Sequence, residues 1–309
     1  MKIIFIGTPE FGAIILEKLC KANLKPVLVV TASDKPVGRK QILTPSSVKI
    51  IAQRYKIKVG QAMSSFREIK PELVLVAAFG QILPEEILEI PKYGCLNVHP
   101  SLLPKYRGAA PVQFAILNGE KETGATIFLM DAEVDHGPIL AQRKTVIGPN
   151  ETMGQLQSRL AVLGAELLID AIPDWIRGKI RLRRQDERRA TYTGILKKED
   201  GKIDWRKSAK IIERQIRAFD PWPGSWTYWQ ILKGKLIRIK ILKARIFSSA
   251  KKTTYSIGKV LVVPQNEIGI QCGKDILVVK MLQIEGKKIT EPEDFLRGHP
   301  DFIRAILKF

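Results

Sequence analysis

Asn97 and His99 are the residues of this chain whose types and spacing most clearly suggest chemistry. They stand at the end of an apolar stretch, residues 95–98, that predicts a β-strand. Since side chains two apart on a strand share a face, we expect the amide and the imidazole to lie side by side. Such a pair can donate hydrogen bonds to an oxygen that becomes negative during a reaction. A lone histidine is more often structural than catalytic, and the residues alone leave both interpretations open.

A carboxylate that could assist this pair lies in the segment MDAEVDHG, residues 130–137. Asp135 could orient the His99 imidazole and favour its cationic form. An aspartate close to a glycine is also a common turn residue, and spacing alone does not decide whether Asp135 reaches His99. Cys95, two residues before Asn97, is interpreted as a packing residue.

Three other segments have competing interpretations. The GTPEFG stretch at 7–12 lacks the spacing of a dinucleotide or phosphate-binding loop, which favours a tight turn over an anion site at a helix start. Residues 34–45 predict a long polar loop containing Arg39, which could close over a phosphate-bearing substrate. The aromatic stretch at 218–226 favours a hydrophobic hinge over a base-stacking surface.

The charge of the chain favours a polyanionic partner. The 309 residues carry 51 Lys+Arg and 31 Asp+Glu, a net charge of +20. Residues 201–309 hold 22 basic and 10 acidic residues, and no acid occurs between Asp220 and Glu267. A second basic cluster spans residues 177–189. Solvated surface lysines could account for the net charge, but two stretches of one sign suit a nucleic-acid backbone better.

The order of predicted elements indicates two architectures in one chain. Apolar strands alternate with helices up to about residue 172, which predicts an α/β fold with a doubly wound, mostly parallel sheet whose sites lie at the carboxyl ends of the strands. Short strands separated by turns follow from residue 226 and predict a small antiparallel β-barrel. The predicted domains are 1–180, a basic linker at 181–206, and 207–309. No apolar run is long enough to span a membrane, and three distant cysteines without a CxxC pair fit a reducing cytosol.

The segments IIFIGTPEFG, DKPVGRK, VAAFGQILP, NVHPSLLPKYRGAAP, TGATIFLMDAEVDHGPIL and KIDWRKSAKIIERQIRAFDPWPGSW together resemble the methionyl-tRNA formyltransferase family. The resemblance extends from residue 2 to about 230. The NxHxSLLP segment with its later DxG is shared by all formyltransferases that use 10-formyltetrahydrofolate, so it identifies the chemistry. The RAFDPWPGSW segment is narrower, and the basic tail favours tRNA over a nucleotide sugar as the acceptor.

This resemblance implies a Rossmann-like formyltransferase domain followed by an OB-like, tRNA-binding barrel. It implies a catalytic group formed by Asn97, His99 and Asp135. It implies a folate site lined by Ser101, Leu102, Leu103 and Pro104, with the pterin ring held by the backbone of Phe79, Gly80, Gln81, Ile82 and Leu83. Together with the charge distribution it predicts tRNA contacts from Arg39, Lys40, Lys233, Lys235, Lys240 and Lys243. Pro100 and His136 differ from the residues of some family members without replacing any of this set.

The expected reaction passes a formyl group from 10-formyltetrahydrofolate to the α-amine of methionyl initiator tRNA, in support of translation initiation. Asn97 and His99 would stabilise the tetrahedral oxyanion, and Asp135 would orient His99 and move protons. No metal is required, and we expect a cytoplasmic monomer. An amino-sugar nucleotide as acceptor is the alternative of the same chemistry. A non-catalytic RNA-binding protein is the alternative of another class.

Overall fold

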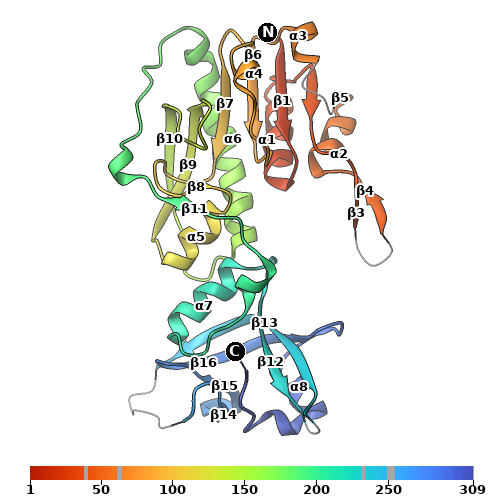
Figure 1. Cartoon of the computed structure of the whole chain (residues 1–309), viewed down its shortest axis with the longest axis vertical. Helices are drawn as coiled ribbons and strands as arrows, with labels where there is room; N and C mark the ends of the chain where they lie inside the picture. The colour runs from red at the N-terminus through yellow and green to blue at the C-terminus, as the bar shows by residue number, and fades with distance from the viewer. Residues whose placement is uncertain (38–40, 61–64, 232–233, 249–254, 309) are drawn as a thin grey trace. The chain divides into compact units, whose positions relative to one another are not determined.

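The chain divides into two compact units, each with its own sheet (Figure 1). The computed structural model describes residues 1–37, 41–60, 65–231, 234–248 and 255–308. The first unit comprises residues 1–112, 121–147 and 155–195, and the second comprises residues 113–120, 148–154 and 196–309. The predicted domain boundaries stay a prediction.

A seven-stranded sheet forms the centre of the first unit, in the order β10-β9-β7-β6-β1-β2-β5. Its parallel strands are β1 (Ile3–Gly7), β2 (Leu28–Val30), β5 (Lys58–Gly60), β6 (Leu73–Ala77) and β7 (Cys95–His99). The antiparallel strands β9 (Glu122–Leu129) and β10 (Ile139–Val146) complete one side. Strands β1 and β6 are buried throughout, as expected of parallel strands covered on both faces. The predicted α/β class is confirmed.

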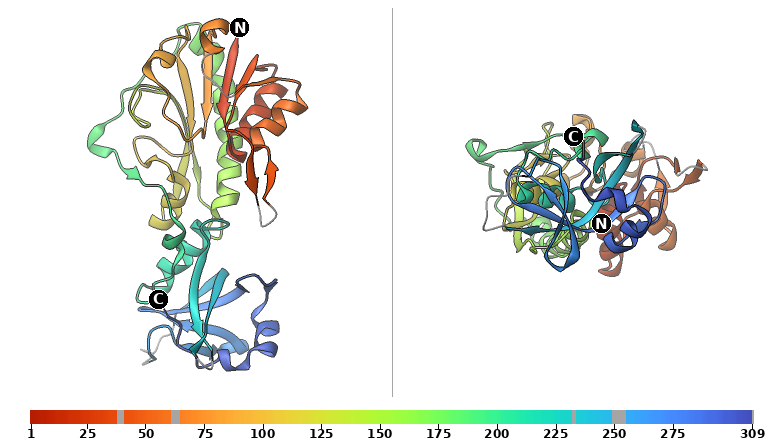
Figure 2. Two further views of the ribbon diagram at one scale, coloured as in Figure 1. Left: turned by 45° about the vertical axis from the view of Figure 1, so that its right-hand side comes forward. Right: turned by 90° about the horizontal axis from the view of Figure 1, so that it is seen from below.

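Helices cover both faces of this sheet (Figures 1 and 2). On one face lie α1 (Glu10–Lys21), which packs on α2 (Ser47–Arg54), and α6 (Met153–Ile176), which is joined to α1 by an ion pair between Lys18 and Glu166. The opposite face packs against α3 (Ser65–Ile69) and α4 (Glu85–Leu88), whose Phe66 and Ile87 join its apolar cluster. A further helix, α5, spans Pro111–Asn118.

Helix α6 decides which face of β7 is open. A Cβ atom at Gly164 of α6 would lie 2.6 Å from Cγ1 of Val98, so the helix lies directly on that residue. Asn97 and His99 flank Val98 on the strand and therefore point to the other face. The helical pattern of residues 151–172 predicts one long helix there, and α6 continues past that range and past Pro173 to Ile176. Its last turn is held by Trp175, whose indole donates to the carbonyl of Tyr93 at 2.9 Å.

The two glycines of the 7–12 segment support the tight-turn interpretation. Cβ atoms at Gly7 and Gly12 would lie 2.7 and 2.9 Å from the carbonyl oxygen of Ala77, so only glycine permits this close approach. The loop predicted over 34–45 contains a short hairpin, formed by β3 (Lys35–Val37) and β4 (Ile42–Thr44). Arg39 and Lys40 lie outside the described residues.

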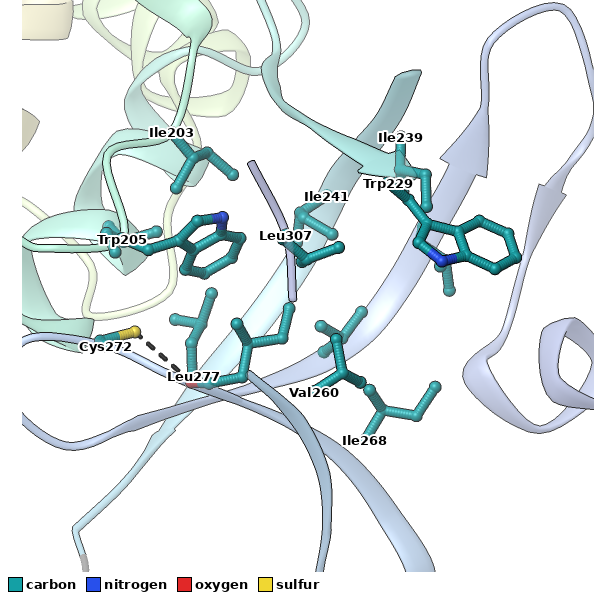
Figure 3. Packing of buried hydrophobic residues seen from close by; sticks show 14 of the residues in the cluster. Ile203, Trp205, Trp229, Ile239, Ile241, Val260, Ile268, Cys272, Leu277 and Leu307 are labelled. Carbon is teal, nitrogen blue, oxygen red and sulfur yellow. Dashed lines mark hydrogen bonds between the residues drawn. The ribbon is translucent and has the colours of Figure 1, made fainter. Parts of the chain in front are cut away.

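The second unit is an antiparallel sheet wrapped around a core, as predicted from its short strands. The order is β12 (Ser225–Gln230), β13 (Leu236–Phe247), β16 (Ile276–Ile284), β15 (Glu267–Gln271) and β14 (Val260–Val263), with β17 (Ile289–Thr290) on β16. Trp205, Ile241 and Leu277 meet in the core between this sheet and α7 (Ala209–Ala218) (Figure 3). The helix α8 (Pro292–Gly298) adds Phe295.

The last residues join the two edges of that sheet. Lys308 pairs with Tyr228 of the edge strand β12, and Ile306 pairs with Lys259 beside the opposite edge strand β14. The tail therefore satisfies backbone groups on both edges, which would otherwise be exposed. Leu307, between the two bridges, is 1% exposed and points into the core (Figure 3). Neither the tail pairing nor α8 was anticipated from the sequence.

Candidate active site

The carboxyl end of β7 presents an amide that is available for a ligand. Asn97 is half-buried, and its side chain makes no hydrogen bond with any residue that the structure describes. Two residues on, His99 is only 5% exposed, beside Thr126 of β9. The pairing of β7 with β6 on one side and β9 on the other fixes both backbone positions. The shared face expected from the sequence is therefore consistent with the structure.

The His99 imidazole lies between two oxygen acceptors. Its Nε2 atom is 2.9 Å from the carbonyl oxygen of Tyr106, and its Nδ1 atom is 3.5 Å from Oδ2 of Asp135. A carbonyl oxygen can only accept, so Nε2 carries a proton and donates to Tyr106. The Nδ1 contact is longer than a normal hydrogen bond. Because Nε2 holds the proton that faces Tyr106, Nδ1 carries a proton only in the imidazolium; in that form Nδ1–H faces Asp135 and can reach a substrate oxygen, while Nε2 anchors the ring.

Asp135 belongs to a turn that is tied to the segment after β7. Its Oδ2 atom accepts a hydrogen bond of 2.7 Å from the backbone N–H of Gly108, and its φ of 51° lies in the left-handed region. The side chains of His99 and Asp135 are 6% and 12% exposed, so their interaction is shielded from solvent. The structure thus brings together the two groups whose distance the sequence left open.

The neighbouring histidine has a different partner. His136 Nδ1 lies 2.7 Å from Oδ2 of Asp131, and this hydrogen bond raises the pKa of His136 above its usual 6.5. The two aspartates of the 130–137 segment therefore serve different rings, Asp131 that of His136 and Asp135 that of His99.

Sequence reasoning missed a set of groups that support the site from residues 185–193. The short strand β8 (Arg107–Gly108) pairs in parallel with β11 (Tyr192–Thr193). Arg107 is fully buried and donates to both carboxylate oxygens of Glu187, at 2.9 and 2.6 Å. This interaction raises the pKa of Arg107 and lowers that of Glu187. The groups at 185–193 follow Arg107 by 78 to 86 residues, so the sequence around Arg107 gives no local signal of them.

The residues predicted to line the folate site fall into two kinds. Ser101 is fully buried, and its hydroxyl donates to the carbonyl of Lys105 at 2.6 Å, which closes the loop after β7. Leu103 packs with Phe128, so it also supports the loop, whereas Leu102 and Pro104 are half-buried. These contacts give Ser101 and Leu103 structural roles, and the binding of folate by residues 101–104 stays a prediction.

The segment that follows β6 is more open. Gly80, Gln81 and Ile82 are exposed, the last to 73%, while Phe79 and Leu83 anchor the segment in the apolar cluster. Within the described chain, the backbone groups of residues 79–82 have no hydrogen-bond partner. This leaves N–H and C=O groups that a planar heterocycle could use.

Of the basic residues predicted to bind RNA, those that the structure describes lie on β13 or directly before it. Lys235, just before the strand, and Lys243 are exposed, and Lys240 is half-buried. Lys233 lies outside the described residues. The pairing of β13 with β16 is irregular on both sides of Lys243, and Ala244 packs against the core after this irregularity. One extra residue of β13 at this point shifts the alternation of inward and outward side chains, so Lys243 does not have to point into the core.

Cys95 does not supply a nucleophile. It is 1% exposed, and burial raises the pKa of its thiol to about 12, so the reactive thiolate is absent at neutral pH. Over the described ranges, no cluster of three or more His, Cys, Asp or Glu residues could hold a metal ion. In the same ranges no helix has the length and apolar character to cross a membrane.

Two family models match nearly the whole chain. The formyl transferase model matches residues 1–172, and the model of the formyl transferase C-terminal domain matches residues 195–300. A methionyl-tRNA formyltransferase of Citrifermentans bemidjiense is 41% identical over 97% of this chain and 94% of its own length. A protein of the same name from Halalkalibacterium halodurans is 42% identical over 96% and 95%.

Solved structures support the fold. The N-formyltransferase of Helicobacter canadensis, solved with folinic acid and dTDP-3-aminofucose, superposes with a TM-score of 0.66 at 22% identity, over 90% of this chain and 98% of its own. HypX of Aquifex aeolicus in complex with tetrahydrofolic acid gives 0.61 at 17% identity, over 96% of this chain and 47% of its own. At such identities the likeness concerns the fold.

Proposed function

The chain belongs to the methionyl-tRNA formyltransferase family, and from this premise we propose that it transfers the formyl group of 10-formyltetrahydrofolate to the α-amine of methionyl initiator tRNA. One observation carries the proposal at the level of chemistry. His99 lies between the Tyr106 carbonyl and the Asp135 carboxylate, next to the Asn97 amide, which makes no hydrogen bond with the residues that the structure describes. This arrangement offers two hydrogen-bond donors to a single oxygen.

The reaction needs such donors. The methionyl amine attacks the formyl carbon, the carbonyl oxygen becomes negative, and the bond between that carbon and N10 of the folate then breaks. The Asn97 amide and the Nδ1–H of His99 donate to the negative oxygen, and one well-placed donor stabilises the transition state by about 2.7–4 kcal/mol. One proton leaves the amine and one reaches N10, so the protons balance. Asp135 carries this proton, directly or through water.

The folate substrate would lie between two segments at the carboxyl ends of neighbouring strands. The backbone of residues 79–82 after β6, which has no hydrogen-bond partner among the described residues, would hold the pterin ring. The loop at 101–104 after β7 would line the other side, held in shape by the buried hydroxyl of Ser101. Carboxyl ends of adjacent parallel strands are where ligands bind in sheets of this class.

The tRNA substrate would contact the basic residues. Lys235, Lys240 and Lys243 are proposed to neutralise phosphates, and Arg39, Lys40 and Lys233 complete the predicted set. The support is charge, since the segment from Asp220 to Glu267 contains no other acid.

A competition assay tests the proposal. The protein is supplied with 10-formyltetrahydrofolate, methionyl initiator tRNA and a nucleoside-diphosphate amino sugar, and both products are quantified. We expect formylmethionyl-tRNA, with no formylated sugar above background. Formylation of the sugar alone would assign the other acceptor. Binding of tRNA without formyl transfer to either acceptor would mean that the protein is a non-catalytic RNA-binding protein.

A further inference from the structure

We propose that Gln185 is a positioning residue that holds Asp135 at its working distance from His99. Nothing in the family resemblance pointed to this residue. It comes from the basic segment 177–189 and makes four hydrogen bonds in the first unit. The inference rests on the proposed function for its kinetic test and on the geometry alone for its spectroscopic test.

The amide nitrogen of Gln185 fixes the turn that carries Asp135. It donates to the backbone carbonyl of Asp135 at 2.9 Å and to that of Gly137 at 2.8 Å. One NH₂ group has two protons, so both donors are used and the two carbonyls are held in one geometry. The catalytic carboxylate therefore lies on a backbone whose position Gln185 determines on both sides of His136.

The amide oxygen of Gln185 fixes the opposing segment. It accepts from Nε and Nη2 of the buried Arg107, at 3.1 and 2.9 Å. The residues on either side of Arg107 are the ones that contact the catalytic pair: Tyr106 accepts from His99, and Gly108 donates to Asp135. A single side chain thus joins both backbone segments that set the His99–Asp135 distance.

The backbone of Asp135 explains why such a restraint is needed. Its φ of 51° is a conformation that is unfavourable for most residues other than glycine, and it persists only where the surroundings enforce it. The two hydrogen bonds from Gln185 and the one from Gly108 supply that enforcement. Without the amide protons of Gln185, the turn can relax and carry the carboxylate away from the imidazole.

Two variants both remove the donors that reach the turn, and they differ in whether an acceptor for Arg107 remains. Gln185→Glu keeps an oxygen for Arg107 and removes both protons that reach the turn. Gln185→Met keeps the length and removes both ends. We expect kcat for formyl transfer to fall about 10- to 100-fold in each, the range for a catalytic group misplaced by about 1 Å. The KM values for folate and tRNA should stay within about twofold, because the amide oxygen and both amide protons of Gln185 are already engaged by protein groups.

The second measurement does not depend on the reaction. The chain has three histidines, so ¹⁵N labelling gives a spectrum with three imidazole sets. His99→Gln, Gln185→Glu and wild-type protein are compared. We expect the Nδ1 signal of His99 to move in Gln185→Glu, because its carboxylate neighbour has moved, while the signals of His299, which packs against Trp229 and Phe295 in the second unit, stay in place.

A matched control is available in the second unit. Gln215 is buried and likewise donates its amide protons to two successive backbone carbonyls, those of Gly201 and Lys202. Gln215→Ala should lower the melting temperature and leave kcat and the His99 signals unchanged. A purely structural role for Gln185 would produce the same pattern in its variants.

The outcomes are distinguishable. Loss of kcat in both Gln185 variants with a moved His99 signal supports the proposal. Unchanged kcat and an unmoved His99 signal, with only a lower melting temperature, would overturn it. If wild-type protein formylates neither acceptor, the proposed function fails, and the His99 signal alone still decides whether Gln185 positions Asp135.

Discussion

Asp135→Asn isolates the charge of the catalytic carboxylate from its shape. Asparagine adopts the left-handed region as readily as aspartate, so the φ of 51° at this position is retained. The side-chain oxygen can still accept the hydrogen bond of Gly108. The amide nitrogen or oxygen that then faces Nδ1 of His99 carries no charge. The variant therefore loses the attraction for an imidazolium while the turn stays in place.

The magnitude follows from the distance. Two unit charges 3.5 Å apart attract by about 5 kcal/mol, taking 332 divided by the product of 3.5 and an effective dielectric constant of about 20. We take about 3 kcal/mol as the smallest expected loss, because this is the largest typical contribution of a hydrogen bond to a charged group. Each 1.36 kcal/mol is a tenfold change in rate, so kcat should fall by about two to four orders of magnitude.

The assay is single-turnover formylation with saturating 10-formyltetrahydrofolate and methionyl initiator tRNA, with tRNA affinity measured separately by filter binding. Asp131→Asn is the matched control, because Asp131 belongs to the same segment but pairs with His136. We expect the control to retain wild-type kcat. The reasoning is refuted if Asp135→Asn stays within about threefold of wild-type kcat, or if its tRNA affinity falls as much as its rate.

Three further predictions concern RNA, pH and the core. Replacing both Lys235 and Lys243 by Gln should raise KM for tRNA and reduce the slope of log K against log salt by about 0.7–0.9 per lost phosphate contact, with KM for folate unchanged; an unchanged slope places the RNA contacts elsewhere. His136→Gln should lower the melting temperature at pH 6 but not at pH 9. Asp131 raises the pKa of His136 in the folded protein, so their interaction contributes stability below the unfolded pKa of 6.5, and this stability is lost as the pH rises through the folded pKa. Equal losses at both pH values would contradict this. Trp205→Ala should destabilise the second unit by about 3–5 kcal/mol in urea unfolding, since the side chain is fully buried, and a loss under 1 kcal/mol would be inconsistent with its place in the core.

The central strands β1 and β6 of the first unit were predictable because they are apolar throughout. The apolar run at 73–79 predicts a strand of that length, but β6 ends at Ala77, two residues earlier, because Ala78 turns the chain with a φ of 50°. A single apolar run gives no signal for such a turn. In the same way the helical pattern of residues 151–172 predicts a helix end four residues too early, because a tertiary hydrogen bond from Trp175 holds the last turn.

The candidate site was predictable in part. The strand period alone places Asn97 and His99 together, and the resemblance added Asp135. The supporting groups were not predictable, since Gln185 and Glu187 stand among arginines in a segment whose charge suggested an RNA contact or linker. What assigns them is the buried Arg107, which requires acceptors from somewhere in the fold. The sequence shows that Arg107 is charged and can donate hydrogen bonds, but it does not show which residues accept them once the side chain is buried.

The parallel pairing of β8 with β11 bears on how the enzyme could be shortened. A fragment that stops at residue 180 would include Asn97, His99 and Asp135. It would leave the Arg107 guanidinium buried without the Glu187 carboxylate that neutralises it. An uncompensated interior charge costs about 3–5 kcal/mol, a large share of the stability of an average domain. Protein engineers who wish to divide this chain should therefore place the cut beyond Thr193.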